Sequence, residues 1–310
     1  MGRYGLVSYI LGSKMVADPQ RSVGVTPGRI RHDEGSLASR AGGAPSLHYY
    51  TTFPEGAPKA VVGLMHGYAE YGGRYAHVAD FWAERGIASI AIDLRGHGRS
   101  EGQRGSCEHF GDYLDDASQL KSLVRERAPG LPAFLFGHSF GGLVAASLVL
   151  AKPAPWRGLL LTAPYLGLAL KVPAVKRLAG VIASRLLPTL SLPSGVHGAD
   201  LTRDSDRARA YDEDPLVFRT ANARWFTEAQ SAQARTIAGA RSMTAPLLVV
   251  MGTADRVADL TSVRAFFESA GSKDKHLDVR DGFFHEILNE PEWRGVAEGL
   301  AEWMLARSQS

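Results

Sequence analysis

Short, predominantly apolar runs alternate with longer amphipathic stretches from about residue 47 onward. Five runs of four to six residues stand out: Ala60–Met65, Ala88–Ile92, Ala133–Phe136, Gly158–Leu161 and Leu247–Met251. Runs of this length are typical of strands buried on both faces of a parallel sheet. The stretches between them have apolar residues at helical spacing; they are Ala76–Arg85, Phe110–Arg127, Leu143–Leu150 and Thr261–Ser269. This alternation predicts a doubly wound α/β fold, with its ligand site at the carboxyl ends of the strands.

The alternation stops between about Leu166 and Thr244. Prolines at 173, 188, 193 and 215 separate helical pieces there, and no strand run is evident. The piece Ala174–Leu187 carries an apolar stripe, with basic residues largely outside it; the stripe is Val175, Leu178, Ile182 and Leu186. Periodicity alone fits two interpretations equally: a helical cap over the carboxyl edge of the sheet, or a helical subdomain packed on the core.

The N-terminal segment 1–44 is rich in Gly, Ser, Arg and Pro and has no sustained period, which predicts a poorly ordered extension. Its apolar run Tyr4–Leu11 is short, is interrupted by Ser8 and lacks a convincing cleavage site after Lys14, so we expect no signal peptide. No stretch approaches the roughly 20 apolar residues that a membrane-spanning helix needs.

Charge and cysteine content narrow the function classes. The 35 basic and 32 acidic residues give a net charge of +3 without a basic block, which argues against a nucleic-acid partner. Cys107 is the only cysteine, so no intrachain disulfide can form, and no Cys/His cluster has zinc-site spacing. The cysteine content permits a reducing compartment, and we expect a cytoplasmic protein that associates peripherally with membranes.

The segment GHSFG at residues 137–141 is the strongest chemical signal. It lies between the apolar run 133–136 and the alanine-rich helical stretch 143–150. Strand, sharp turn and helix around G-x-S-x-G predict a nucleophile elbow, in which only small residues fit beside the strained serine. The helix N-terminus then lies beneath developing negative charge. Ser139 is therefore the predicted nucleophile.

A serine hydroxyl needs a base to remove its proton, and this topology requires the chain order serine, acid, histidine. Three histidines follow Ser139: His197, His276 and His285. His197 lies in the proline-rich insertion, and His276 begins an alternating strand pattern. His285 follows that strand in a glycine-containing loop, from which a base can reach over the sheet edge. His285 is the predicted general base.

The acidic residue that orients the histidine is expected at the end of a buried strand. Asp255 closes the segment Gly252–Asp255 after the run Leu247–Met251. From there it can accept a hydrogen bond from the ring of His285, which fixes the tautomer and stabilises the imidazolium. Asp259 competes for this role, but such a residue more often begins a helix. The position at the strand end favours Asp255.

The oxyanion of an acyl-transfer intermediate needs at least two backbone N–H donors. One is expected from Phe140, the residue after the nucleophile, and the second from Tyr68, in the loop after Ala60–Met65. His66 in the same loop is expected to be structural. The segment Asp93–Ser100 lacks phosphate-loop spacing and paired metal ligands, so we expect a loop braced by charges and glycine turns.

These motifs together resemble the monoacylglycerol lipase branch of the serine α/β-hydrolases, also labelled lysophospholipase-like. The matching segments are His66-Gly67, residues 93–102, Gly137–Gly142, Gly252–Asp255, His285-Glu286, Leu201–Asp204, Tyr211–Leu216, Lys275 and Leu288–Pro291. The resemblance spans about residues 45–305. It implies an α/β-hydrolase fold with a mostly parallel central sheet flanked by helices. The core would comprise residues 45–165 and 245–310, and a helical cap residues 166–244.

The resemblance also implies cofactor-free hydrolysis of lipid esters, most specifically of monoacylglycerol to fatty acid and glycerol. By similarity Ser139, Asp255 and His285 form the triad, and Tyr68 and Phe140 the oxyanion hole. Apolar cap residues are expected to line the acyl tunnel or to make transient contact with a lipid surface; they are Leu166, Leu168, Leu170, Val175 and Leu178.

Three alternatives remain open at this point. A lysophospholipase or a broad carboxylesterase would use the same triad. Epoxide hydrolases and dehalogenases normally have aspartate at the nucleophile position, so Ser139 argues against both. A hydrolase-like binding protein would often lack a triad residue, and here all three are present. The bulky rings of Phe140, Phe283 and Phe284 leave the preferred acyl length open.

Overall fold

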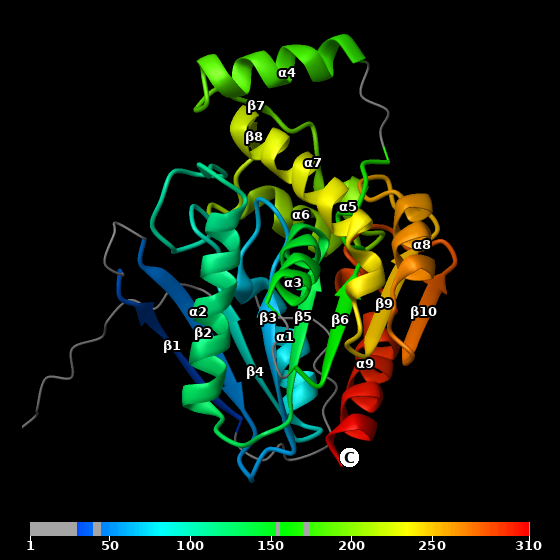
Figure 1. Ribbon diagram of the computed structural model, residues 1–310. Coiled ribbons are helices and arrows are strands. Elements are labelled where there is room, and N and C mark those ends of the chain that lie inside the picture. The colour runs from blue at the N-terminus through cyan, green and yellow to red at the C-terminus, as the bar shows by residue number, and fades with distance from the viewer. Residues whose placement is uncertain (1–29, 40–44, 153–155, 170–173, 310) are drawn as a thin grey trace, which may run out of the picture.

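A central sheet with helices on both faces forms the body of the computed structural model, and a smaller helical layer lies above one edge of the sheet (Figure 1). The structure describes residues 30–39, 45–152, 156–169 and 174–309, and for residues 174–179 it describes the backbone alone.

The sheet has eight strands in the order β1-β2-β4-β3-β5-β6-β9-β10. Their bounds are Arg31–Leu37 (β1), Leu47–Phe53 (β2), Ala60–Met65 (β3), Ile87–Ile92 (β4), Ala133–His138 (β5), Gly158–Thr162 (β6), Leu247–Gly252 (β9) and Lys275–Arg280 (β10). β2 runs antiparallel to β1 and β4, and every other neighbouring pair is parallel. The mostly parallel sheet confirms the predicted α/β class.

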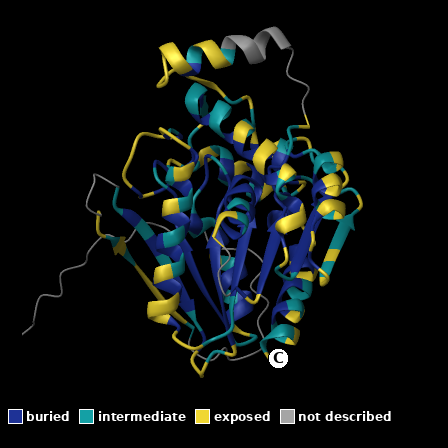
Figure 2. Ribbon diagram, in the orientation of Figure 1, coloured by how far each residue is buried: buried dark blue, intermediate teal, exposed yellow. Residues whose placement is uncertain are grey.

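Helices cover both faces of this sheet, as the continuous apolar strand runs require. α1 (Ala76–Ala83) and α9 (Trp293–Ser308) pack on one face, and α2 (Gly111–Arg127), α3 (Ser139–Ala151) and α8 (Leu260–Ser269) on the other (Figure 1). All residues of β3, β4 and β9 are buried, so the core lies along both faces of the central strands (Figure 2).

The segment between β6 and β9 lies above the carboxyl ends of the strands (Figure 1). It contains α4 (Ala174–Leu186), β7 (Ser191–Pro193), α5 (Gly198–Leu201), α6 (Ser205–Glu213), β8 (Thr220–Asn222) and α7 (Ala223–Ala238). β7 and β8 pair antiparallel, so the expectation of no strand here is wrong. Each has only three residues, which is too short to produce an apolar run. None of the helices in the described ranges combines the length and the apolar character needed to span a bilayer.

The N-terminal prediction is wrong for one segment. Residues 1–44 were expected to lack order, yet Arg31–Leu37 form β1, which pairs along its whole length with β2. β1 is an edge strand with mostly exposed polar side chains, and its backbone hydrogen bonds hold it in place. Such a strand leaves no hydrophobic pattern in the sequence. The run Tyr4–Leu11 lies outside the described residues.

Candidate active site

The turn between β5 and α3 holds Ser139 in a strained conformation. Its φ of +51° lies in the left-handed region, which residues other than glycine rarely adopt. A Cβ atom on Gly137 would lie 2.5 Å from the carbonyl oxygen of Gly141, and one on Gly141 would collide with the carbonyl oxygen of Met65. The glycines are therefore needed for the close approach of strand and helix, as the motif predicts.

Three side chains from three strand ends form one hydrogen-bonded chain. The Nε2 atom of His285 lies 2.8 Å from the Oγ of Ser139, and its Nδ1 lies 2.8 Å from the Oδ2 of Asp255. The other oxygen of Asp255 accepts the backbone N–H groups of Val257 and Ala258, at 2.7 and 2.9 Å. With its Nδ1 proton donated to Asp255, the His285 ring presents Nε2 as an acceptor toward Ser139.

The competing residues lie elsewhere. The carboxylate of Asp259 accepts hydrogen bonds from the N–H groups of Thr261 and Ser262 at the start of α8. It therefore caps a helix and does not pair with His285. His197 precedes α5, and His276 is exposed on β10. The geometry therefore pairs Asp255, not Asp259, with His285, as predicted from its position at the strand end.

Burial and charge set the protonation of the site. Burial by itself would lower the pKa of His285, but the charge and hydrogen bond of Asp255 outweigh it, so that pKa is raised. Burial would raise the pKa of Asp255, yet the charge and hydrogen bond of His285 lower it. His138, whose ring lies 5.0 Å from that of His285, has a pKa of about 3, because of burial and then the His285 charge. Asp255 is therefore ionised, and His138, which lies next to His285, is neutral.

Both predicted oxyanion donors lie next to Ser139. Phe140 is the second residue of α3, so its N–H has no acceptor within the helix. Tyr68 follows β3 in a loop that lies against the nucleophile: a Cβ on Gly67 would lie 3.3 Å from the Cβ of Ser139. Tyr68 and Phe140 therefore come from different elements and both lie close to Ser139, which is the placement that an oxyanion hole needs.

A buried ionic cluster joins the Tyr68 loop to the His285 loop. Arg74 contacts Glu70 at 2.6 Å and forms a two-point contact with Glu286, at 2.5 and 2.9 Å. Glu70 also accepts the backbone N–H of Gly67, at 2.6 Å. Sequence analysis missed this cluster. The spacing of four between Glu70 and Arg74 was its only local sign, and Glu286 was noticed only as part of a motif.

The pKa values of the two carboxylates in this cluster are shifted in opposite directions. Burial would raise the pKa of Glu286, but the charge and hydrogen bonds of Arg74 lower it to about 2. Burial raises the pKa of Glu70, and repulsion from Glu286 adds to that rise although Arg74 opposes it. Glu286 is therefore the firmly ionised partner of the guanidinium.

Histidine and aspartate residues next to the site are structural. The Nε2 of His66 accepts the backbone N–H of Leu94 at 2.9 Å, and its Nδ1 donates to the carbonyl of Gly67 at 2.7 Å. The carboxylate of Asp93 accepts the N–H of Arg99 at 2.8 Å. These contacts agree with the predictions that His66 is structural and that the 93–100 segment is a braced loop. In the described ranges no group of three or more His, Cys, Asp or Glu side chains is arranged to hold a metal ion.

The residues expected to contact the acyl chain are only partly described. Leu166 is buried in the main core, and Leu168 is half-buried and bridges to Ala258 in the loop after Asp255. Leu170 lies outside the described residues. Val175 and Leu178 belong to α4, but their side chains are also outside the description.

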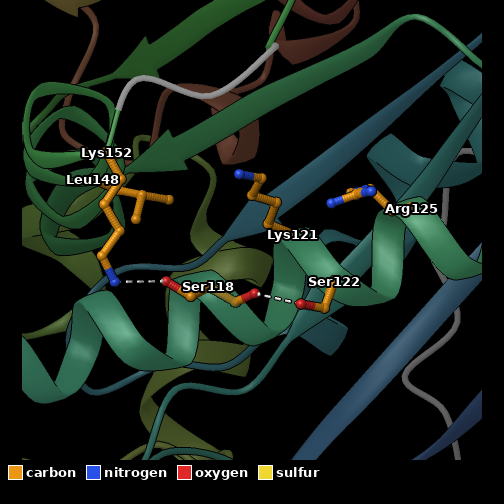
Figure 3. Close-up of a pocket in the computed structure, with 6 residues that line it drawn as sticks. All are labelled: Ser118, Lys121, Ser122, Arg125, Leu148 and Lys152. Atoms are coloured by element: carbon orange, nitrogen blue, oxygen red, sulfur yellow. Dashed lines mark hydrogen bonds between the residues drawn. The ribbon is translucent and has the colours of Figure 1, made fainter.

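A basic pocket of about 290 Å³ lies elsewhere on the surface, between α2 and the end of α3 (Figure 3). It is lined by Ser118, Lys121, Ser122, Arg125, Leu148 and Lys152. Lys152 directly follows the last residue of α3 and Ser139 is its first residue, so the helix separates this pocket from Ser139 by about 20 Å. The pocket is therefore not part of the triad site.

Comparison with known proteins agrees with this geometry. The chain matches the family model described as "Serine aminopeptidase, S33" over residues 56–292. It is 30% identical over 265 residues to the monoacylglycerol lipase of Mycolicibacterium smegmatis, covering 85% of this chain and 94% of the relative. It belongs to the monoacylglycerol lipase branch of the serine α/β-hydrolases. As a member of that branch, the protein is a serine ester hydrolase.

Two further relatives extend this result. The phospholipase YtpA of Bacillus subtilis is 33% identical over 247 residues, covering 79% of this chain and 95% of the relative. The crystal structure of the Paleococcus ferrophilus monoacylglycerol lipase superposes with a TM-score of 0.76 at 30% identity, covering 84% of this chain and 99% of that one. This similarity confirms the α/β-hydrolase fold.

Proposed function

We propose that this serine ester hydrolase cleaves lipid esters, most specifically monoacylglycerols, through an acyl-enzyme on Ser139. The observation that supports the proposal is the hydrogen-bonded chain from Ser139 through His285 to Asp255, with 2.8 Å at each link. This spacing is that of a nucleophile, a general base and an orienting acid. A binding protein without catalysis has no need of such a chain.

The mechanism has two acyl transfers. In the first, His285 takes the proton of Ser139 while the Oγ attacks the ester carbonyl, and the N–H groups of Tyr68 and Phe140 stabilise the oxyanion. The tetrahedral intermediate collapses, the bond to the alcohol oxygen breaks, and His285 protonates the departing glycerol. In the second transfer, His285 takes a proton from water, which attacks the acyl-enzyme. The fatty acid then leaves, and His285 returns the proton to Ser139.

The names of the relatives support lipid esters as the substrate class. Two of them, from M. smegmatis and P. ferrophilus, are named monoacylglycerol lipases. YtpA is named a phospholipase and is slightly more similar in sequence, so a lysophospholipid is the second candidate. The two candidates share the acyl group and differ in the leaving alcohol, which is neutral in one and carries a phosphodiester in the other.

An exposed apolar surface on the segment above the strand ends supports the same class, and we propose that residues 166–244 act as a cap that contacts lipid. Every large hydrophobic side chain that is exposed in the described part of the chain lies between residues 181 and 192, on α4 and the segment through β7 (Figure 2). They are Val181, Ile182, Leu186, Leu187, Leu190 and Leu192. We call these six residues the apolar ridge. A gathered apolar surface beside exposed Arg185 suits peripheral contact with a lipid layer.

The deciding experiment measures the release of fatty acid from a long-chain monoacylglycerol and from a lysophosphatidylcholine with the same acyl chain. A short-chain aryl ester is the third substrate, and the Ser139→Ala variant supplies the blank. Faster hydrolysis of the monoacylglycerol is the expected result. A preference for the lysophospholipid would favour the second candidate. Hydrolysis of the aryl ester alone would reject both lipid substrates and leave a general esterase.

A further inference from the structure

One tryptophan from the segment above the strand ends packs on both residues that we assign to the oxyanion hole. Trp225 is the third residue of α7, and only 6% of it is exposed. Its ring stacks on that of Tyr68, with centroids 3.6 Å apart and planes 23° apart. It also meets the ring of Phe140 edge-on, with centroids at 5.3 Å. A single side chain therefore lies against the two residues whose N–H groups would hold the oxyanion.

Hydrogen bonds fix the Tyr68 side chain to the same turn of α7. Its hydroxyl donates to the carbonyl of Gly105 at 2.9 Å and accepts the backbone N–H of Asn222 at 3.4 Å. Asn222 caps α7, and its side-chain oxygen accepts the N–H of Trp225 at 3.2 Å. The start of α7 thus holds Tyr68 by a stacked ring and by a hydrogen bond.

A second connection links α7 to the nucleophile itself. The side-chain amide of Gln233 donates to the carbonyl of Tyr165 at 2.9 Å. The N–H of Tyr165 in turn donates to the carbonyl of Ser139, also at 2.9 Å. α7 is therefore connected to the nucleophile as well as to Tyr68 and Phe140, and the ring of Trp225 also lies parallel to that of Tyr165, with centroids 6.1 Å apart.

We propose that Trp225 is a positioning residue, which sets the backbone at Tyr68 and Phe140 so that both N–H groups point at the developing oxyanion. The inference rests on the proposed acyl-transfer function. Donors in an oxyanion hole act through their fixed direction, because reorienting them during the reaction would consume the stabilisation they provide. A misplacement of about 1 Å can reduce the rate by about 10²-fold. A rigid ring stacked on one donor residue and abutting the other is suited to prevent such a shift.

The test compares Trp225→Leu with Phe226→Leu, a matched loss of an aromatic ring at the next position of α7. Phe226 packs on the core, and its ring is not among those that stack on Tyr68 or Phe140 in the described residues. Activity is measured on 4-nitrophenyl acetate, a small soluble ester without a long acyl chain. Binding of the oxyanion is measured as inhibition by a short alkyl trifluoromethyl ketone, which forms a tetrahedral adduct with the serine. A thermal melt checks that each variant is folded.

Trp225→Leu is expected to lower kcat by at least about tenfold, with KM little changed. It should weaken inhibition by the ketone by a similar factor. Phe226→Leu is expected to leave kcat and ketone affinity as in the wild type. The loss from Trp225→Leu should shrink when Tyr68 is already leucine, because the two act as a unit. If Trp225→Leu lowers only the melting temperature, and the folded variant keeps its kcat and ketone affinity, the proposal is overturned.

A second variant and a wild-type control separate loss of folding and failure of the proposed function from failure of the positioning role. Trp225→Met, whose flexible side chain adapts to the buried space without a ring, replaces the leucine variant if that protein does not fold, and the same outcomes apply. Wild-type hydrolysis of the aryl ester and of the long-chain monoacylglycerol above the Ser139→Ala blank is measured first. Absence of both activities would reject the proposed function, whereas wild-type activity with an unaffected Trp225 variant would reject only the positioning role.

Discussion

The Nδ1 atom of His285 lies 2.8 Å from the Oδ2 atom of Asp255, and the two residues come from the ends of adjacent parallel strands, β10 and β9. The side-chain pair is almost completely shielded from water, with 5% and 1% of the side chains exposed. In such a position the carboxylate both holds the imidazole tautomer and stabilises the charge that the ring acquires during acyl transfer.

Replacement of Asp255 by asparagine is expected to lower kcat by about 10⁴-fold, because the ring would lose the partner that keeps its proton on Nδ1. Asp259→Asn is the matched control. Asparagine also caps helices well, so this variant should keep both its activity and its stability. Steady-state kinetics on a soluble aryl ester measure the activity of the two variants. Loss of activity in the Asp259 variant with survival of the Asp255 variant would contradict the assignment of the acid.

Substitution of Ser139 by alanine is expected to lower kcat by at least about 10⁴-fold, since no other nucleophile replaces the hydroxyl. Fluorophosphonate labelling of the protein should disappear as well, because the probe forms a bond to the serine oxygen. Residual labelling at another residue, with turnover intact, would show that the nucleophile lies elsewhere. A thermal melt of the variant separates a chemical loss from unfolding.

The pH profile should reveal the environment of His285. The general base works only when neutral, so kcat/KM falls as pH drops through the pKa of His285. Because Asp255 raises that pKa, the midpoint of the acid limb is expected above the ordinary histidine value. In the Asp255→Asn variant the midpoint should move to lower pH. A midpoint that stays in place in this variant would show that Asp255 does not raise the pKa of the base.

Loss of the Arg74 guanidinium should destabilise the fold strongly. Arg74→Met would leave Glu70 and Glu286 buried without their cation, and breaking a buried pair in this way costs about 3–5 kcal/mol. Arg209→Met is the control, because Arg209 and its partner Asp206 are both largely exposed, and such pairs contribute about 1 kcal/mol or less. Urea unfolding measures the two free energies. Equal losses would mean that the buried cluster is no more important than a surface pair.

The apolar ridge gives a prediction about lipid surfaces. Leu186→Ser and Leu187→Ser together are expected to weaken binding to phosphatidylglycerol vesicles and to slow hydrolysis of emulsified monoacylglycerol, because each removes exposed apolar area. Activity on a soluble short-chain ester should not change. Thr189→Ser, at an exposed neighbouring position, leaves the six side chains of the apolar ridge in place and is the control. Unchanged vesicle binding in the double variant would reject the lipid-docking role.

The residues of the triad could be predicted because the fold puts them at positions that the sequence marks. Ser139 and Asp255 each follow a continuous apolar run, and these runs are β5 and β9. His285 was the remaining histidine once strand patterning had accounted for His276. Local pattern and chain order were sufficient to select three residues whose side chains the structure joins by hydrogen bonds.

The buried cluster could not be predicted in the same way. Arg74 and Glu286 are 212 positions apart, and each lies in a polar segment that resembles an exposed loop. Whether a charged side chain is buried depends on which distant segment packs over it. Trp225 was missed for a similar reason: its helix shows an apolar face but does not indicate which rings that face will meet.

The positive φ of Ser139 has a consequence for how this enzyme can be improved. A residue other than glycine in that region carries a penalty of about 1–3 kcal/mol, which the folded state bears in every molecule. Glycine adopts the same angle freely, so Ser139→Gly would relieve the penalty while removing the hydroxyl. Screening variants for heat resistance alone would therefore reward the loss of the nucleophile. Engineering of a thermostable form has to select for turnover and for melting temperature together.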